Sequence, residues 1–295
     1  MTPRARPSGH DRGRDVPHSP PPGPFYLPHG ERTGDGGGTV GEFEATPSTT
    51  GPWYADAQHM GPPSALLVRA MERLPESRPG GAEAGWRLAR ASVEVLGMVP
   101  AGPVTVTAEV ERPGRTIELL SATMSAGGRD VLRARAWRLA AGDTAGAEQG
   151  AVAPLPGPGT GTIRTERPDG WLPGFLDATE WSWLGGDELG ALGPARTWVR
   201  LRVPLVDGEE PTPAQRLMVA ADCANGVAAP LDVRKWLFVN TELTVHLHRA
   251  PEGEWIGVDA ATVIGPDGLG TCSATLFDEH GHTGRSGQAL TVRPR

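Results

Sequence analysis

Ser121-Ala122-Thr123-Met124 and Ser273-Ala274-Thr275-Leu276 are nearly the same tetrapeptide, and this repetition decides the fold. A turn follows each copy, at Gly127-Gly128 and at His280-Gly281. Landmarks further upstream repeat as well, because Leu96-x-x-x-Pro100-x-Gly102 matches Leu247-x-x-x-Pro251-x-Gly253. The offset stays at about 151–153 residues, which indicates a duplicated domain and not a solenoid of short repeats.

Length and composition restrict the class of protein. With 295 residues, the chain has room for two domains that each bury a core. The formal net charge of -7 argues against nucleic-acid binding, which favours a basic surface. Cys223 and Cys272 are too few for a disulfide framework or a thiolate zinc site, so we expect a reduced, cytoplasmic setting. We expect neither a membrane span nor a signal peptide, because the apolar runs stay well below the ~20 residues of a spanning helix.

Each copy combines one helix pattern with several strand patterns. Proline is tolerated in a first helical turn, so we predict helices over residues 62–74 and 214–228. Partial alternation of apolar and polar residues predicts strands at 86–96, 104–111, 116–124, 131–139, 238–248, 254–264, 268–277 and 284–292, with weaker patterns at 25–27, 40–44, 180–184 and 196–203. A helix followed by an antiparallel meander indicates an α+β fold in which a sheet wraps the helix.

Composition divides the chain into four segments. Residues 1–23 are rich in Pro, Gly, Arg and His, and we expect this tail to be disordered. The first domain is predicted at residues 24–140. Residues 141–174 begin with a stretch rich in Ala, Gly and Pro and form the predicted linker. The second domain is predicted at residues 175–295.

Three polar side chains of the second copy are candidates for catalysis. Asp222 lies in the most apolar part of the predicted second helix, where a carboxylate is costly unless it is hydrogen-bonded or functional. Burial there raises the pKa of a carboxyl group toward that of a usable general base. Asn240 lies near the start of a predicted strand, and Gln288 lies in mid-strand beside Gly287, where a ligand can approach closely. Their amides suit the orientation of a water molecule if they meet Asp222 in space, and a purely structural role for each residue stays open.

Most of the remaining sequence motifs argue against a metal site or a cofactor. His246 and His248 share one strand face, but no third ligand lies at recognisable spacing, so we expect no metal site. His59 precedes the first helix and fits either a catalytic or a capping role. Because the chain has no nucleophile elbow, dinucleotide-binding glycine motif or Walker A motif, we expect no cofactor. A carboxylate with amides remains, and this combination suits direct activation of water.

Several short motifs, taken together, resemble the TesB-like acyl-CoA thioesterases. In the first half they are Gly51-Pro52-Trp53, Asp56-Ala57-Gln58-His59, Gly61-Pro62-Pro63 and Ala65-Leu66-Leu67. In the second half they are Trp198-x-Arg200, Pro204-Leu205-Val206, Ala221-Asp222, Phe238-x-Asn240, Leu243-Thr244-Val245-His246-Leu247-His248-Arg249 and Gly253-Glu254-Trp255. The resemblance covers roughly residues 25–292. It implies a double hotdog fold and hydrolysis of an acyl-CoA thioester to a free acid and CoA.

The resemblance also implies roles for single residues. In that family an Asp, a Thr and a Gln hold the attacking water. Asp222 and Gln288 match the Asp and the Gln, whereas Asn240 stands where the Thr usually lies. Around His59, Met60 and Gly61, the start of the first helix is expected to bind substrate and to receive the developing oxyanion.

The CoA part of the expected substrate and the oligomeric state give two further expectations. CoA phosphates need cations, for which Arg249, Arg234 and Lys235 are candidates because they lie near the site in sequence. Double hotdog proteins often pair further, so we consider a homo-oligomer. No nucleic-acid partner is expected.

Two other functions stay in view. A hotdog hydratase or dehydratase needs a His–acid pair aimed at the acyl chain, and His59 is the histidine that lies at a helix start. A non-catalytic acyl-CoA or lipid-binding module needs only the fold and a pocket.

Comparison of the two copies predicts an asymmetry. With Gly128 aligned on Gly281, Gln288 falls on Arg135. The offset of the tetrapeptides places Asp222 near Ala70. We therefore expect the second copy to supply the water-activating groups, and the first to supply packing and an oxyanion donor.

Overall fold

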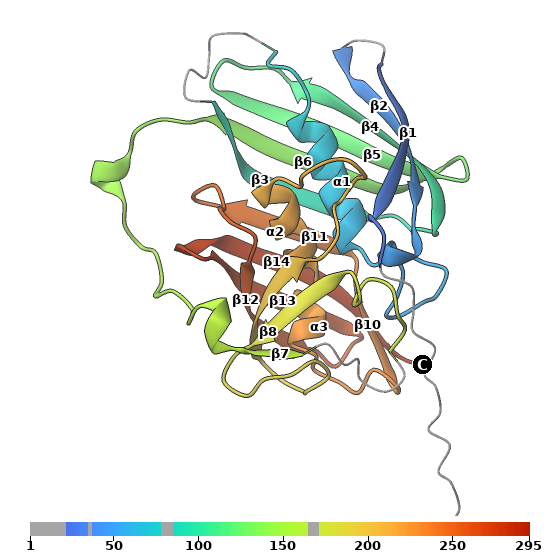
Figure 1. Ribbon diagram of the computed structural model, residues 1–295, viewed down its shortest axis with the longest axis vertical. Helices are drawn as coiled ribbons and strands as arrows, with labels where there is room; N and C mark the ends of the chain where they lie inside the picture. The colour runs from blue at the N-terminus through green and yellow to red at the C-terminus, as the bar shows by residue number, and fades with distance from the viewer. Residues whose placement is uncertain (1–21, 35–36, 78–84, 165–170) are drawn as a thin grey trace, which may run out of the picture.

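The computed structural model describes residues 22–34, 37–77, 85–164 and 171–295 (Figure 1). The disorder predicted for residues 1–23 falls almost wholly outside these ranges. The first half of the chain forms one α-helix and a set of long strands. They are β1 (Tyr26–Thr33), β2 (Thr39–Ala45), α1 (Gly61–Glu72), β3 (Trp86–Val95), β4 (Gly102–Arg112), β5 (Ile117–Ala126) and β6 (Arg129–Ala140), with a 3-10 turn at Pro47–Thr49.

The second half repeats this plan after a long connection. Its elements are β7 (Thr162–Arg164), β8 (Thr179–Trp183), β9 (Ala195–Leu201), α2 (Pro213–Asp222), α3 (Ala224–Val227), β10 (Trp236–Asn240), β11 (Glu242–Leu247), β12 (Ile256–Ile264), β13 (Leu269–Asp278) and β14 (Gly281–Pro294). Within the described residues, no helix is both long and apolar enough to cross a lipid bilayer.

One continuous sheet holds the described strands together. Its order is β1-β2-β4-β5-β6-β3-β11-β14-β13-β12-β9-β8-β7, and β10 pairs with β14 next to β11. The two halves join in the middle, where β3 and β11 pair antiparallel. From this junction outward, the strand order of one half repeats that of the other, which confirms the predicted α+β duplication.

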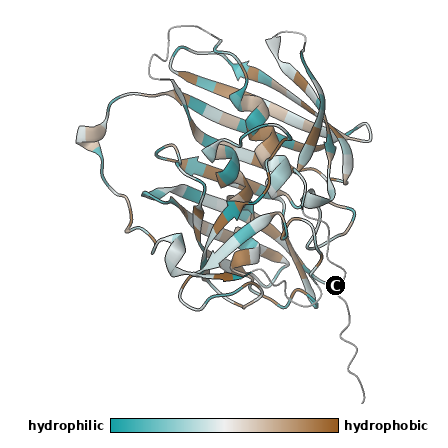
Figure 2. Cartoon of the chain, viewed as in Figure 1, coloured by the Kyte–Doolittle hydropathy of each residue, from teal (hydrophilic) through white to brown (hydrophobic). Residues whose placement is uncertain are grey.

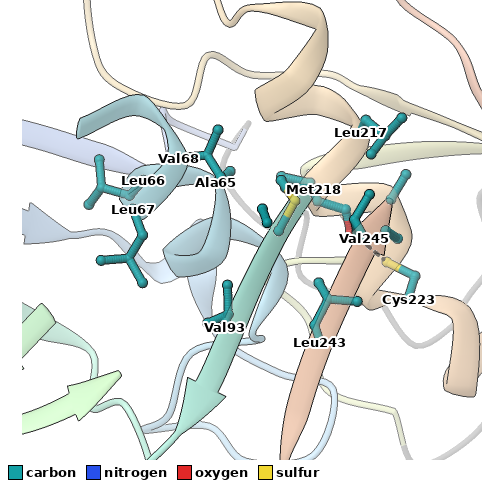
Figure 3. Close-up of a cluster of buried hydrophobic side chains, with 14 of the residues drawn as sticks. Ala65, Leu66, Leu67, Val68, Val93, Leu217, Met218, Cys223, Leu243 and Val245 are labelled. Atoms are coloured by element: carbon teal, nitrogen blue, oxygen red, sulfur yellow. Dashed lines mark hydrogen bonds between the residues drawn. The ribbon is translucent and has the colours of Figure 1, made fainter. Parts of the chain in front are cut away.

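The two long helices pack antiparallel on the same face of this sheet (Figure 1). Gly61, the first residue of α1, lies so close to Val219 of α2 that a Cβ atom on Gly61 would be 3.0 Å from the Val219 carbonyl oxygen. At the opposite ends, the Gln215 amide of α2 donates to the Glu72 carboxylate of α1 at 2.7 Å. Figure 3 shows apolar side chains of both helices, together with Val93 of β3 and Val245 of β11. The start of α1 is therefore held against the end of α2.

Binary patterning explains how the strands face this core. Along β5 and β13, buried residues alternate with more exposed ones, and Figure 2 shows the same alternation as stripes of hydrophobic and hydrophilic colour on the strands. Helix α1 is buried along almost its whole length, as its apolar sequence predicts. Arg69 is the charged exception, and it pairs with Glu31 at 2.7 Å and Glu209 at 2.6 Å. These pairs give a buried guanidinium the partners that it needs.

From α1 to β14 the duplication holds at a constant offset of 152 residues, whereas Phe43 of β2 corresponds to Val199 of β9 at an offset of 156. Gly61 and Pro213 start the two helices, and Ser121 pairs with Arg135 where Ser273 pairs with Gly287. The structure therefore makes Gln288 equivalent to Ala136 of the other copy, so the predicted equivalence with Arg135 is wrong by one residue. A slip of one residue along a strand exchanges its two faces. Accordingly Ala136 is buried like Gln288, whereas Arg135 is exposed.

Two elements predicted as continuous are each broken. The helix predicted at 214–228 divides into α2 and α3 at Cys223, and the strand predicted at 238–248 divides into β10 and β11 at Thr241. In the strand, the Thr241 amide donates to the Ala289 carbonyl, while the residues on its two sides keep separate pairing registers with β14. The two breaks directly follow Asp222 and Asn240 in the sequence.

The connection between the halves packs against the second one. It leaves β6, passes along the outside of the molecule and ends in β7, which pairs with β8 (Figure 1). On the way, the Pro156 carbonyl accepts from the Trp198 indole at 2.8 Å, and the Pro158 carbonyl accepts from the Ser182 hydroxyl at 2.6 Å. The predicted linker at 141–174 thus adds an edge strand and several contacts to the second half.

Candidate active site

A cavity of about 330 Å³ opens where the start of α1 meets the end of α2. Polar side chains and a larger number of apolar side chains line it. The polar lining residues that concern the chemistry are Gln58, His59, Asp222, Asn225 and Asn240. The apolar walls include Trp53, Leu96, Met98, Val99, Leu237 and Val239. A largely apolar cavity with a few convergent polar groups is typical of a small-molecule site.

Asp222 is the central group of the cavity. Only 3% of this residue is exposed, which confirms the burial predicted from its apolar helix. Its Oδ1 accepts from the Asn240 Nδ2 at 2.8 Å, and its Oδ2 lies 3.2 Å from the His59 Nδ1. Burial raises the pKa of Asp222 to about 7, against the opposing effects of the bonds from Asn240 and from the Gly61 amide. A carboxyl group with this pKa is matched to proton transfer near neutral pH.

His59 faces Asp222 from the other half of the chain. Its ring stacks on Phe175, with centroids 3.8 Å apart and planes at 2°. Burial lowers the pKa of His59 to about 3, so the imidazole is neutral at physiological pH. The Nδ1 atom accepts from the Gly61 amide at 3.2 Å and is the same atom that faces the Asp222 carboxyl. His59 is therefore a neutral acceptor beside Asp222 and not a counter-charge.

Gln288 meets Asp222 through the backbone. Its Nε2 donates to the Asp222 carbonyl at 3.0 Å, and its Oε1 accepts from the Asn225 amide at 3.2 Å. The Asn225 side chain in turn donates to the Phe238 carbonyl of β10 at 3.2 Å. Both ends of the Gln288 amide are thus bonded to the junction of α2 and α3. This arrangement fixes the end of the helix that carries Asp222.

The start of α1 presents few backbone donors. Pro62 and Pro63 have no N–H group, and the Gly61 amide bonds to the His59 Nδ1. Across the described residues, the Met60 amide has no hydrogen-bond acceptor, and Met60 lines the cavity. Because unsatisfied amides at a helix N-terminus attract negative charge, Met60 is the available donor for an oxyanion.

The three predicted CoA-binding cations lie in different places. Arg249 forms a bidentate pair with Asp278 and also bonds to the carbonyls of His282 and Gly281. Its guanidinium is thus engaged in holding a turn of the second half. Arg234 and the exposed Lys235 instead precede β10, whose residues Leu237, Val239 and Asn240 line the cavity.

The two strand histidines do not form a metal centre in the described part of the chain. His246 is exposed, and His248 packs against His282 with ring centroids 4.5 Å apart. No group of three or more potential metal ligands occurs among the described residues.

Phe175 and Asn225 have no distinct signal in the sequence, and Trp53 occurs there only as part of a motif, with no role. Phe175 supports His59, and Asn225 anchors α3 to β10. Trp53 contacts Phe238 edge to face with centroids 5.3 Å apart and forms a wall of the cavity. Each of these contacts joins segments far apart in the chain, so no local pattern predicts it.

Comparisons with known proteins agree with this architecture. Residues 49–139 match the family model of the acyl-CoA thioesterase N-terminal domain, and residues 148–292 match that of the C-terminal domain. No curated protein is significantly similar to the chain in sequence.

Solved structures share the fold at low sequence identity. The acyl-CoA thioesterase II TesB2 of Mycobacterium marinum is 14% identical, with a TM-score of 0.64 over 90% of this chain and 96% of that one. The tesB protein of Mycobacterium avium subs paratuberculosis is 16% identical, with a TM-score of 0.63 over 89% and 95%. A hot dog fold protein of unknown function from Alicyclobacillus acidocaldarius is 14% identical, with a TM-score of 0.66 over 88% and 94%. The chain therefore belongs to the acyl-CoA thioesterase family, whose N-terminal and C-terminal domains it joins in one double hotdog polypeptide.

Proposed function

We propose that this protein hydrolyses an acyl-CoA thioester to a free acid and CoA, with Asp222 as the general base. The observation that carries the proposal is the buried Asp222 carboxyl, whose pKa of about 7 and position in the cavity suit water activation. Membership of the acyl-CoA thioesterase family supports the same substrate class.

The proposed reaction begins with a water molecule between Asp222 and Asn240. Asn240 uses its Nδ2 to hold Asp222, which leaves its Oδ1 to accept a hydrogen bond from one O–H group of the water. Asp222 takes the other proton as the water oxygen attacks the thioester carbonyl. The Met60 amide stabilises the oxyanion of the tetrahedral intermediate. Collapse of this intermediate breaks the C–S bond, and the proton on Asp222 passes to the departing thiolate.

Gln288 has a different role in this proposal from the one that the resemblance implies. Because both ends of its amide bond to backbone, Gln288 acts through the position of Asp222 and not on the water itself. Asn240 is then the single amide side chain that holds the water with Asp222.

The direct test is a hydrolysis assay on the purified protein. Acyl-CoA substrates of increasing chain length are supplied, and release of the free thiol is followed with a chromogenic disulfide. Turnover that depends on the enzyme supports the proposal. Tight binding of acyl-CoA without thiol release at any chain length contradicts it and indicates a binding module.

The pH dependence of the rate follows from the raised pKa of Asp222. A general base works only when deprotonated, so kcat/KM is expected to rise about tenfold per pH unit below pH 7 and to level off above it. Because the pKa of His59 lies near 3, this residue contributes no second limb between pH 5 and 9. A profile that is flat from pH 5 to 8 contradicts the assignment of Asp222 as the base.

The contact between His59 and Asp222 favours a second candidate, a hydratase or dehydratase of acyl thioesters. Such an enzyme adds water across a carbon–carbon double bond without release of thiol. Supplying a 2-enoyl-CoA and following both the loss of the conjugated double bond and the free thiol separates the two reactions.

His59→Asn tests the role of the imidazole in the same assays. Asparagine keeps an oxygen near the Nδ1 position, which can still accept from the Gly61 amide, but it cannot transfer a proton. If thioester hydrolysis is the function, the rate is expected to fall no more than about tenfold. If His59→Asn instead lowers the rate of hydration of the 2-enoyl-CoA by about 10²–10⁴, the magnitude of general acid–base catalysis, the hydratase is favoured.

A further inference from the structure

A second cavity, of about 280 Å³, adjoins the catalytic one and shares Trp53 as a wall. It is lined by two tryptophans, Trp53 and Trp171, and by two arginines, Arg234 and Arg295. The indole rings lie 6.2 Å apart, and the Arg295 guanidinium lies over Trp53 at 5.7 Å from its centroid. The cavity therefore combines aromatic faces with positive charge.

Tight packing between the two halves holds these aromatic groups in place. A Cβ atom on Gly51 would lie 2.8 Å from the Pro173 carbonyl oxygen, so the backbones on either side of the tryptophans are in contact. The Phe175 amide donates to the Thr50 carbonyl at 2.8 Å across the same junction. Trp53 is further fixed by its edge-to-face contact with Phe238. The aromatic wall is thus preformed.

Positive charge continues from this cavity to the mouth of the catalytic one. Arg293 lines the catalytic cavity, is exposed and has no ion-pair partner among the described residues. Strand β14 carries it two residues before Arg295, whose amide donates to the Lys235 carbonyl. Arg234, although hydrogen-bonded to Asp232, adds a further guanidinium to the wall. In a chain with a net charge of -7, this gathering of cations at one opening requires an explanation.

We propose that the second cavity binds the adenine nucleotide end of CoA, with the base against the tryptophans and the phosphates on Arg293 and Arg295. Guanidinium groups bind phosphate oxygens in bidentate fashion, and aromatic faces stack on nucleobases. The pantetheine arm then passes Trp53 and brings the thioester to Asp222. This assignment rests on the proposed thioesterase function and extends it, because it selects CoA over carriers that lack a nucleotide.

The test compares one acyl group on two carriers. Acyl-CoA has the nucleotide, whereas the N-acetylcysteamine thioester has only the end of the pantetheine arm. For Arg293→Ala and Arg295→Ala, the preference for the CoA thioester, as a ratio of kcat/KM values, is expected to fall about tenfold, mainly through KM of acyl-CoA. Arg285→Ala is the matched control, since it removes an exposed arginine eight residues earlier on the same strand. An unchanged preference in both arginine variants overturns the proposal.

A binding experiment separates this proposal from the catalytic one. Binding is measured by isothermal titration with CoA, and with adenosine 3′,5′-bisphosphate as the nucleotide alone. The dissociation constants of Arg293→Ala and Arg295→Ala are expected to be about tenfold higher than those of Arg285→Ala. If this holds while no thioester is hydrolysed, the nucleotide site stands and the thioesterase proposal fails. If hydrolysis occurs but CoA binds all variants equally, the nucleotide site fails. The proposal is also overturned if the arginine variants raise KM only for an acyl group carried on an acidic carrier protein and leave KM for acyl-CoA unchanged.

Discussion

Replacing Asp222 with asparagine is expected to lower kcat/KM for thioester hydrolysis by about 10²–10⁴, because the variant has no general base. Asparagine has the same shape, and its oxygen can still accept from the Asn240 Nδ2. Its amide can donate to the His59 Nδ1 in place of the carboxyl group. The loss is therefore expected in kcat, with the fold intact, and is measured by steady-state kinetics at pH 8.

The same substitution is expected to make the protein more stable above neutral pH. The pKa of Asp222 is raised in the folded state, so its proton is lost at a lower pH in the unfolded chain than in the native one. Folding is then weakened as pH rises from about 4 to 7, by ~4 kcal/mol in total, and the weakening persists above pH 7. Asp222→Asn does not carry this cost. Its thermal unfolding midpoint is expected to exceed that of the wild type at pH 8 and to match it near pH 4.

Glu72 offers a control for the activity measured with Asp222→Asn. It is a second carboxyl group between the helices, at the opposite end of the pair, and burial raises its pKa as well. The Thr212 hydroxyl and the Gln215 side-chain amide donate hydrogen bonds to the Glu72 carboxylate, and the same two residues cap α2. Glu72→Gln is expected to keep activity within about threefold. Activity retained by Asp222→Asn, or lost equally in both variants, contradicts the role of Asp222.

The two ends of the helix pair show why the duplicated fold has one candidate site. With the constant offset of 152 residues, Asp222, Asn240 and Gln288 correspond to Ala70, Leu88 and Ala136. The first copy thus has apolar residues at all three positions. The predicted equivalence of Asp222 with Ala70 is confirmed, and Gln288 is equivalent to Ala136 in place of the predicted Arg135.

Local sequence patterns predict most of the elements and the burial of Asp222, but not the breaks at Cys223 and Thr241 or the edge strand β7. Alternation and proline placement predict the strands and helices, and the apolar surroundings of Asp222 predict its burial. The contact of His59 with Asp222 joins residues from different halves and depends on antiparallel helix packing, which no local pattern specifies. The backbone bonds of Gln288 depend on the break in the helix at Cys223, and no proline or glycine at that position signals this break.

Replacing Gly174 with alanine is expected to destabilise the protein by about 3 kcal/mol and to lower kcat. The φ angle of Gly174 is +113°, a conformation that L side chains rarely adopt. A Cβ atom there would also lie 2.7 Å from the carbonyl oxygens of Pro47 and Thr50, which are backbone atoms of the other half. The unfolding midpoint is therefore expected to fall by roughly 6–12 °C.

Gly186→Ala separates the two causes of this effect. Gly186 has a φ of +90°, but a Cβ atom on it would have no neighbouring atom within 4 Å, so only the backbone strain of about 1 kcal/mol applies. Its midpoint is expected to fall by roughly 2–4 °C, with kcat unchanged. Gly174→Ala, in contrast, displaces the adjacent Phe175, on which the His59 ring stacks. Equal effects of the two variants on the unfolding midpoint and on kcat would mean that contact between the halves at Gly174 does not hold His59 against Asp222.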